Sequence, residues 1–187
     1  MYAASPSGSI DQGVILRDCY IYALDAHQHG LILTPRCDFA QRKADSVHIA
    51  GVLDAHEVIR EFITHEWKDI GLADADGNPM SSSPLSNTKR TALTKKLFEL
   101  MKQKYPRYHW LAPLPDSATP LVVDFQLITS CPMVELETYQ IAAELVSPFR
   151  ETISARYAAY MGRIGTPDLH SEEMNALAAL AINTVFG

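Results

Sequence analysis

Cys37, Asp38 and His48 are the residues whose types and spacing come nearest to a nucleophilic site in this chain. Two short apolar strands, 31–34 and 46–53, flank a polar loop that begins just before Cys37. A cysteine nucleophile needs a nearby histidine or cation that favours the thiolate, and a carboxylate that orients the base. If the two strands form a hairpin, its rim would place Cys37 as nucleophile, His48 as base and Asp38 as the orienting carboxylate.

A structural role accounts for the same residues. Cysteine is among the most frequently buried residue types, and Cys37 could be a small apolar residue at a strand end. Asp38 would then cap the turn at 39–43. Neighbours in an extended strand also point to opposite faces, which would separate the thiol from the carboxylate. The sequence leaves both interpretations open.

A second candidate site is the basic segment from Thr88 to Tyr108. Seven basic residues and one acid give this segment a charge of +6, so the remainder of a chain with net charge −6 carries −12. Clustered cations next to aromatic residues are typical of proteins that bind single-stranded nucleic acid. The residues expected to bind a nucleic-acid or protein partner are Lys89, Arg90, Lys95, Lys96, Lys102, Arg107 and Tyr108. The alternative is a solvated helix face beside aromatic residues of the core.

Other classes of site find little support. The three cysteines, Cys19, Cys37 and Cys131, form no CxxC pair, and the histidines are scattered without an HExxH motif. Walker, GxGxxG and GxSxG motifs are also absent from the sequence. We therefore expect neither a metal nor a cofactor.

Size and composition predict a single soluble domain. The chain has 187 residues, of which 47% are apolar and 20% charged, as in ordinary globular proteins. No apolar run approaches the ~18 residues of a membrane-spanning helix, and residues 1–12 lack the basic and apolar order of a secretory signal. An odd number of widely spaced cysteines is typical of reduced thiols. These features predict a cytoplasmic protein without a membrane partner.

Hydrophobic periodicity and breaker residues predict an α+β fold. The expected strands are 13–24, 31–34, 46–53, 108–111 and 121–130, with a turn at His27–Gly30. The expected helices are 55–70, 88–105, one that begins at Ser147-Pro148 and ends at Gly165, and 171–186; segment 135–145 fits either a strand or a helix. This order predicts a small antiparallel, SH3-like barrel or sheet from 10–53 and 106–146. A helical insertion, 54–105, and C-terminal helices, 147–186, would pack against it.

The first ~50 residues resemble the barrel of PemK/MazF-type toxins. Gly13-Val14-Ile15, 31–34 and Val47-His48-Ile49-Ala50 stand where that family has its first apolar strands. The resemblance implies an SH3-like barrel. The family's Arg-Pro pair is replaced here by His29-Gly30, and its catalytic threonine would fall at 51–53, where this chain has none. A ribonuclease of this kind would therefore be a degenerate member that lacks the family's catalytic arginine and threonine.

Three functions are consistent with the sequence. The first is a non-catalytic prokaryotic interaction module of a defence, toxin–antitoxin or mobile-element locus that binds a protein or nucleic-acid partner. The second is a cysteine-dependent hydrolase that uses Cys37 and His48. The third is a degenerate toxin-like ribonuclease.

Overall fold

The computed structural model describes residues 1–41, 44–74 and 86–162, so the helix predicted at 171–186 lies outside the described residues. The strands are β1 (Val14–Ile21), β2 (Ala26–Ile32), β3 (Ser46–Asp54), β4 (Tyr108–Leu111), β5 (Leu121–Pro132) and β6 (Ile141–Glu144). The α-helices are α1 (Arg36–Ala40), α2 (Ala55–His65), α3 (Asn87–Met101) and α4 (Phe149–Met161). Short 3-10 helices are η1 (Tyr22–Leu24), η2 (Lys68–Ile70) and η3 (Met133–Thr138).

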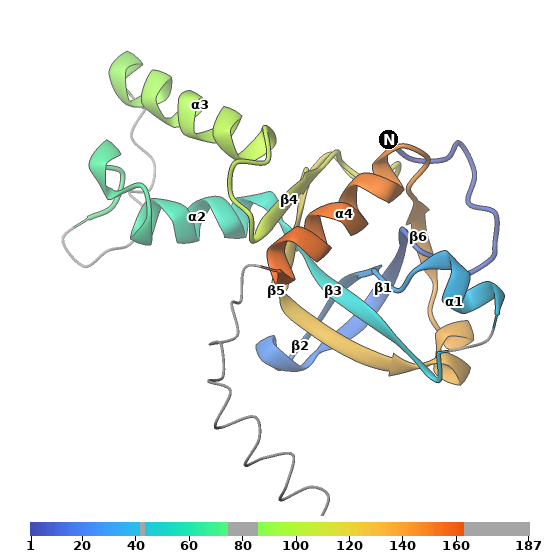
Figure 1. Ribbon diagram of the computed structural model, residues 1–187. Helices are drawn as coiled ribbons and strands as arrows, with labels where there is room; N and C mark the ends of the chain where they lie inside the picture. The colour runs from blue at the N-terminus through green and yellow to red at the C-terminus, as the bar shows by residue number, and fades with distance from the viewer. Residues whose placement is uncertain (42–43, 75–85, 163–187) are drawn as a thin grey trace, which may run out of the picture.

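The six strands form one antiparallel sheet in the order β4-β5-β3-β2-β1-β6, and the sheet curls into a half-barrel (Figure 1). Helices α2 and α3 lie together to one side of this half-barrel, whereas α4 crosses over the sheet (Figure 1). The α+β class predicted from the sequence is therefore confirmed. The helices within the described ranges are each too short or too polar to cross a lipid bilayer.

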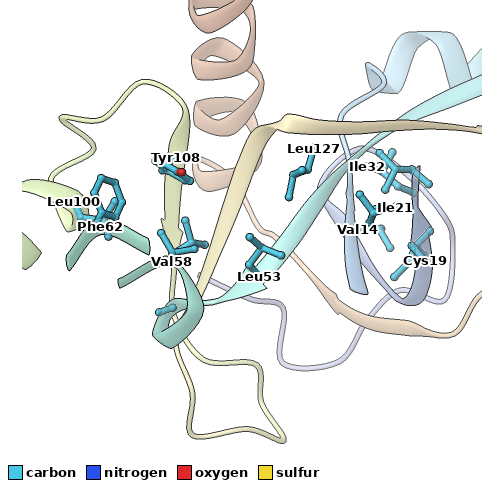
Figure 2. Close-up of a cluster of buried hydrophobic side chains, with 14 of the residues drawn as sticks. Val14, Cys19, Ile21, Ile32, Leu53, Val58, Phe62, Leu100, Tyr108 and Leu127 are labelled. Atoms are coloured by element: carbon cyan, nitrogen blue, oxygen red, sulfur yellow. The ribbon is translucent and has the colours of Figure 1, made fainter. Parts of the chain in front are cut away.

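Alternating side chains give the sheet two buried faces. On one face Val14 and Ile49 belong to the same apolar cluster as Phe62 of α2. Figure 2 shows part of this cluster running from the half-barrel to the two helices. On the other face Ile15 lies in a second cluster with Ile153 of α4. The half-barrel is thus covered by helices from two different parts of the chain.

Strand β5 bends where its pairing with β3 changes register. Ala50 pairs with Ile128 but Gly51 pairs with Asp124, so residues 125–127 bulge out of the ladder. Before the bend β5 pairs with the short strand β4, and Tyr108 lies opposite Asp124. The bend therefore marks the junction between the half-barrel and the part of the sheet that carries β4.

Asp124 stabilises this bend from a fully buried position, with 0% of its surface exposed. Its Oδ1 accepts hydrogen bonds from the backbone N–H of Gln126 at 2.9 Å and from Nε of Arg107 at 2.8 Å. Its Oδ2 accepts a third from Nη2 of Arg107 at 2.6 Å. A buried carboxylate is tolerated only when it is paired and hydrogen-bonded in this way.

Side chains close the outer edge of β4. The amide of Gln103 accepts from the backbone N–H of Trp110 at 3.2 Å and donates to the carbonyl of the same residue at 3.4 Å. Arg156 of α4 donates to the carbonyl of Tyr108 at 3.1 Å and to that of Gln103 at 3.1 Å. An edge strand with its backbone groups occupied is protected against pairing with another chain.

The first hairpin differs from the sequence prediction. His27–Gly30 was predicted to be a turn, but these residues belong to β2, and the chain reverses earlier, at η1. Gly30 is needed for close packing: a Cβ there would lie 2.5 Å from Cγ2 of Ile49 and 2.7 Å from Sγ of Cys19. The glycine thus permits a close approach of neighbouring strands, a long-range requirement that resembles a turn signal in the sequence.

Several predicted boundaries also shift. The polar loop after Pro35 contains α1, and the helix predicted at 55–70 ends at His65 because the N–H groups of Glu66 and Trp67 both bond to the carbonyl of Phe62. The helix predicted at 88–105 ends at Met101, before Gln103 adopts a φ of 61°. The undecided segment 135–145 divides between η3 and β6.

His109 of β4 predicts an acid-dependent loss of stability. It is only 4% exposed, and its Nδ1 has no hydrogen-bond partner among the described residues. Burial, and then the charge of Arg156, lower the pKa of His109 to about 4. In the unfolded chain the pKa should be near 6.5, so the unfolded state binds more protons as the pH falls. The stability due to neutral His109 is therefore complete above about pH 6.5 and is lost as the pH approaches 4.

Between pH 7 and pH 4 we expect the free energy of unfolding to fall by about 3 kcal/mol less in His109→Gln than in the parent protein. This estimate follows from about 1.36 kcal/mol per unit of pKa difference. Urea unfolding of both proteins at several pH values measures this difference, and the comparison cancels the contribution of carboxylates that titrate in both. Parallel pH profiles would contradict the assignment.

Candidate functional site

A pocket between α1, β3 and α4 contains two of the three predicted catalytic residues. Its volume is about 380 Å³, and Asp38 and His48 both line it. The other polar residues of the lining are Thr34, Ser46, Ser154 and Tyr157. His48 is fixed in place through its backbone, because its N–H donates to Oγ1 of Thr34 at 2.8 Å. Helix α1 and strand β3 therefore bring the carboxylate and the imidazole to one pocket.

Cys37 is placed differently. It lies in α1 and is exposed, so the interpretation of a buried structural cysteine is wrong. The described residues that line the pocket do not include it. Its Sγ donates to Oδ1 of Asp38 at 3.5 Å, and this carboxylate supplies no positive charge to the sulfur. The geometry thus unites Asp38 and His48 but leaves the thiol at the surface.

Four cations of the basic segment form hydrogen bonds or ion pairs with other residues of the protein. Lys89 donates to the carbonyl of Gly71 at 2.6 Å, and Lys96 pairs with Asp69 at 3.6 Å. The two others form the pairs Lys104–Glu99, at 3.7 Å, and Arg107–Asp124, at 2.6 Å. Tyr108 is buried and cannot present an open ring to a base. Much of the basic cluster therefore has a structural role.

Three cations remain at the surface. Arg90, Lys95 and Lys102 are exposed, and no ion pair is found for them within the described part of the chain. They belong to the same side of α3 as Phe98, which is 54% exposed. We call this surface the α3 face and define it by its exposed residues Arg90, Thr91, Thr94, Lys95, Phe98, Met101 and Lys102.

Phe98 occupies the middle of the α3 face. At 100° per residue, Lys95 and Lys102 lie about 60° and 40° to one side of it, and Met101 lies about 60° to the other. Met101 falls in one helical arc with Leu93, Leu97 and Leu100, yet it is 40% exposed. The reason is the peripheral position of α3: it packs against β4 and η2, and Leu100 is its only fully buried residue within the described chain.

The sequence reasoning missed Phe98 as a functional candidate. A helical projection of 88–105 would have shown Phe98 beside Lys95 and Lys102, away from the arc of Leu93, Leu97 and Leu100. Such an apolar residue inside a charged face is the available signal for a binding surface.

Comparisons with known proteins assign no family. The scan against protein-family models gives no match, and the search of curated proteins gives none either. The resemblance to PemK/MazF-type barrels therefore stays a prediction. Within residues 1–41, 44–74 and 86–162, no three histidine, cysteine, aspartate or glutamate residues are grouped in a way that could hold a metal ion.

The different environments of the cysteines lead to a prediction about thiol reactivity. Cys37 is exposed, whereas Cys19 and Cys131 are buried, and burial raises the pKa of Cys19 to about 12. We expect a neutral thiol probe at pH 7 to label one cysteine rapidly in the native chain and all three after unfolding. The native rate should be close to that of a free cysteine.

Cys37→Ala should abolish the rapid phase and leave the melting temperature unchanged. A labelling rate far above that of free cysteine would indicate an activated thiolate and would favour the hydrolase hypothesis instead.

Proposed function

We propose that this chain is a non-catalytic binding module that captures an acidic, partly apolar segment of a protein partner on the α3 face. The half-barrel, which we take to be SH3-like, would act as a rigid support for the α2–α3 region. The observation that carries the proposal is the exposed Phe98, with Lys95 and Lys102 about one helical turn before and after it and Arg90 about two turns before it. Full burial of an aromatic side chain contributes about 1.5–3 kcal/mol, and covering the exposed half of Phe98 would contribute about half of that.

The charge distribution favours a protein partner over a nucleic acid. Only three cations of the α3 face are without an ion pair in the described part of the chain, and the chain outside 88–108 carries −12. Three phosphate contacts with a single strand would give a slope of log K against log salt of about −2, a weak electrostatic term. An acidic peptide needs fewer ionic contacts because Phe98 and Met101 supply apolar area.

The face is also held in a fixed position before binding. Lys89 and Lys96 tie α3 to the η2 region through Gly71 and Asp69. Trp67 of that region donates from Nε1 to the hydroxyl of Tyr105 at 3.0 Å. A preformed surface loses less conformational entropy on association, which increases affinity for a given contact area.

A cysteine-dependent hydrolase is the second candidate. The observation in its favour is that Asp38 and His48 line one pocket. It ranks lower because Cys37, the proposed nucleophile, is not part of that lining among the described residues. The toxin-like ribonuclease rests on the family resemblance alone.

Selection from an unbiased peptide library against the immobilised protein tests the proposal. We expect the enriched peptides to carry aspartate or glutamate around apolar residues. Phe98→Ala, or the double change Lys95→Glu with Lys102→Glu, should weaken their binding at least about tenfold, or 1.4 kcal/mol. Lys68→Glu, an exposed lysine on η2 with the same change of charge per substituted residue, serves as the control and should bind normally.

Enriched peptides without acidic residues, or binding that survives both changes to the α3 face, would contradict the proposal. A single-stranded oligothymidine that binds more tightly than the selected peptides, with a steep salt dependence, would point to a nucleic-acid partner.

A further inference from the structure

A second pocket, of about 220 Å³, lies between the C-terminal end of α2 and the turn that leads into β4. Three aromatic residues, Phe62, Tyr105 and Tyr108, contribute to its lining. Two carboxylates, Glu61 and Glu66, line it as well, together with Arg107. We call it the aromatic pocket. It shares no residue with the α3 face.

The aromatic residues of this pocket hold one another in place. Phe62 stacks on Trp67 with ring centroids 4.7 Å apart, and it meets Tyr105 edge-on at 4.8 Å. The ring centroid of Tyr108 lies 5.2 Å from that of Phe62. Figure 2 shows Phe62 and Tyr108 beside Leu100 and Val58 in the same buried cluster. The apolar part of the pocket is therefore preformed.

The charges around the pocket are mainly negative. Glu61 is half-exposed, with its Oε1 3.8 Å from Nη1 of Arg107, and Glu66 has no ion pair within the described residues. The guanidinium of Arg107 is already neutralised by the bidentate contact with Asp124. Glu61, Glu66 and Asp124 against one guanidinium leave an excess of two negative charges. His65, which also lines the pocket, is counted as neutral.

Two further features favour a cation here. The pocket lies at the C-terminal end of α2, where the helix dipole is negative. Arg107 provides an internal example, because its guanidinium carbon lies 4.7 Å from the centroid of the Tyr108 ring. That distance is typical of a cation–π contact. The site thus already holds one cation on an aromatic surface and retains carboxylates for another.

We propose that the aromatic pocket binds an alkylammonium group, such as a lysine side chain, its methylated forms or a free quaternary amine. The volume is below the 300–1,000 Å³ typical of drug-sized ligands, so it suits a single head group. Glu61 and Glu66 would supply charge. The ring of Tyr105, which unlike Phe62 and Tyr108 is not buried, would contact the methyl or methylene groups. A guanidinium fits less well because its broad plane would lie beside Arg107.

Choline and its neutral isostere 3,3-dimethyl-1-butanol separate charge from shape in the test. In a Trp110→Phe background Trp67 is the single tryptophan, and its contact with Phe62 makes its fluorescence a reporter of the pocket. We expect saturable binding of choline at millimolar concentration and at least tenfold weaker binding of the isostere. Peptides with lysine or trimethyllysine, titrated in the same way, distinguish a protein-borne ammonium from a free amine.

Glu61→Gln and Glu66→Gln should each weaken choline binding several-fold while the melting temperature stays close to that of the parent. Glu57→Gln, an exposed carboxylate earlier on the same helix, is the matched control and should leave binding unchanged. Tyr105→Leu keeps an apolar side chain but removes a ring, and it should also weaken binding.

Equal binding of choline and its isostere would overturn the proposal, as would the absence of any saturable response to choline and both peptides. Insensitivity to both glutamate changes would do the same. None of these outcomes bears on the α3 face, whose test uses different residues and acidic ligands.

Discussion

The ion pair between Arg107 and the buried Asp124 is the interaction on which the rest of this structure depends. Asp124 lies at the bend of β5, where the register of its ladder with β3 shifts and its pairing with β4 ends. Arg107 satisfies both carboxylate oxygens and also contacts Glu61 of α2 and the ring of Tyr108. Loss of the partner of a buried carboxylate destabilises a fold by several kcal/mol. The pair therefore holds the bend of β5 and the turn between α3 and β4 together.

This arrangement explains how a small half-barrel can support binding surfaces on helices that lie to one side of it. The Arg107–Asp124 pair and Arg156 fix the turn between α3 and β4, and that turn contributes a wall of the aromatic pocket. The α3 face and the aromatic pocket have opposite charge preferences, and they share a support but no residues. Sites carried on rigid elements present their side chains with little loss of entropy on binding.

The sequence predicted those elements whose signals are local. The runs of β-branched and apolar residues at 46–53 and 121–130 correctly predicted β3 and β5, and the α+β class followed from their order. Long-range packing accounts for the failures. Gly30 looked like a turn residue because the close approach of Ile49 is invisible in the sequence. The exposure of Phe98 depends on the peripheral place of α3, and the structural role of Arg107 depends on Asp124, a partner outside the basic segment.

A double-mutant cycle of Arg107→Gln and Asp124→Asn, measured by urea unfolding, tests the central claim most directly. If the pair holds the bend and the turn together, each single change should cost about 3–5 kcal/mol. The double change should cost much less than the sum, with a coupling free energy of about 2–3 kcal/mol. Additive losses, within about 0.5 kcal/mol, would contradict this account.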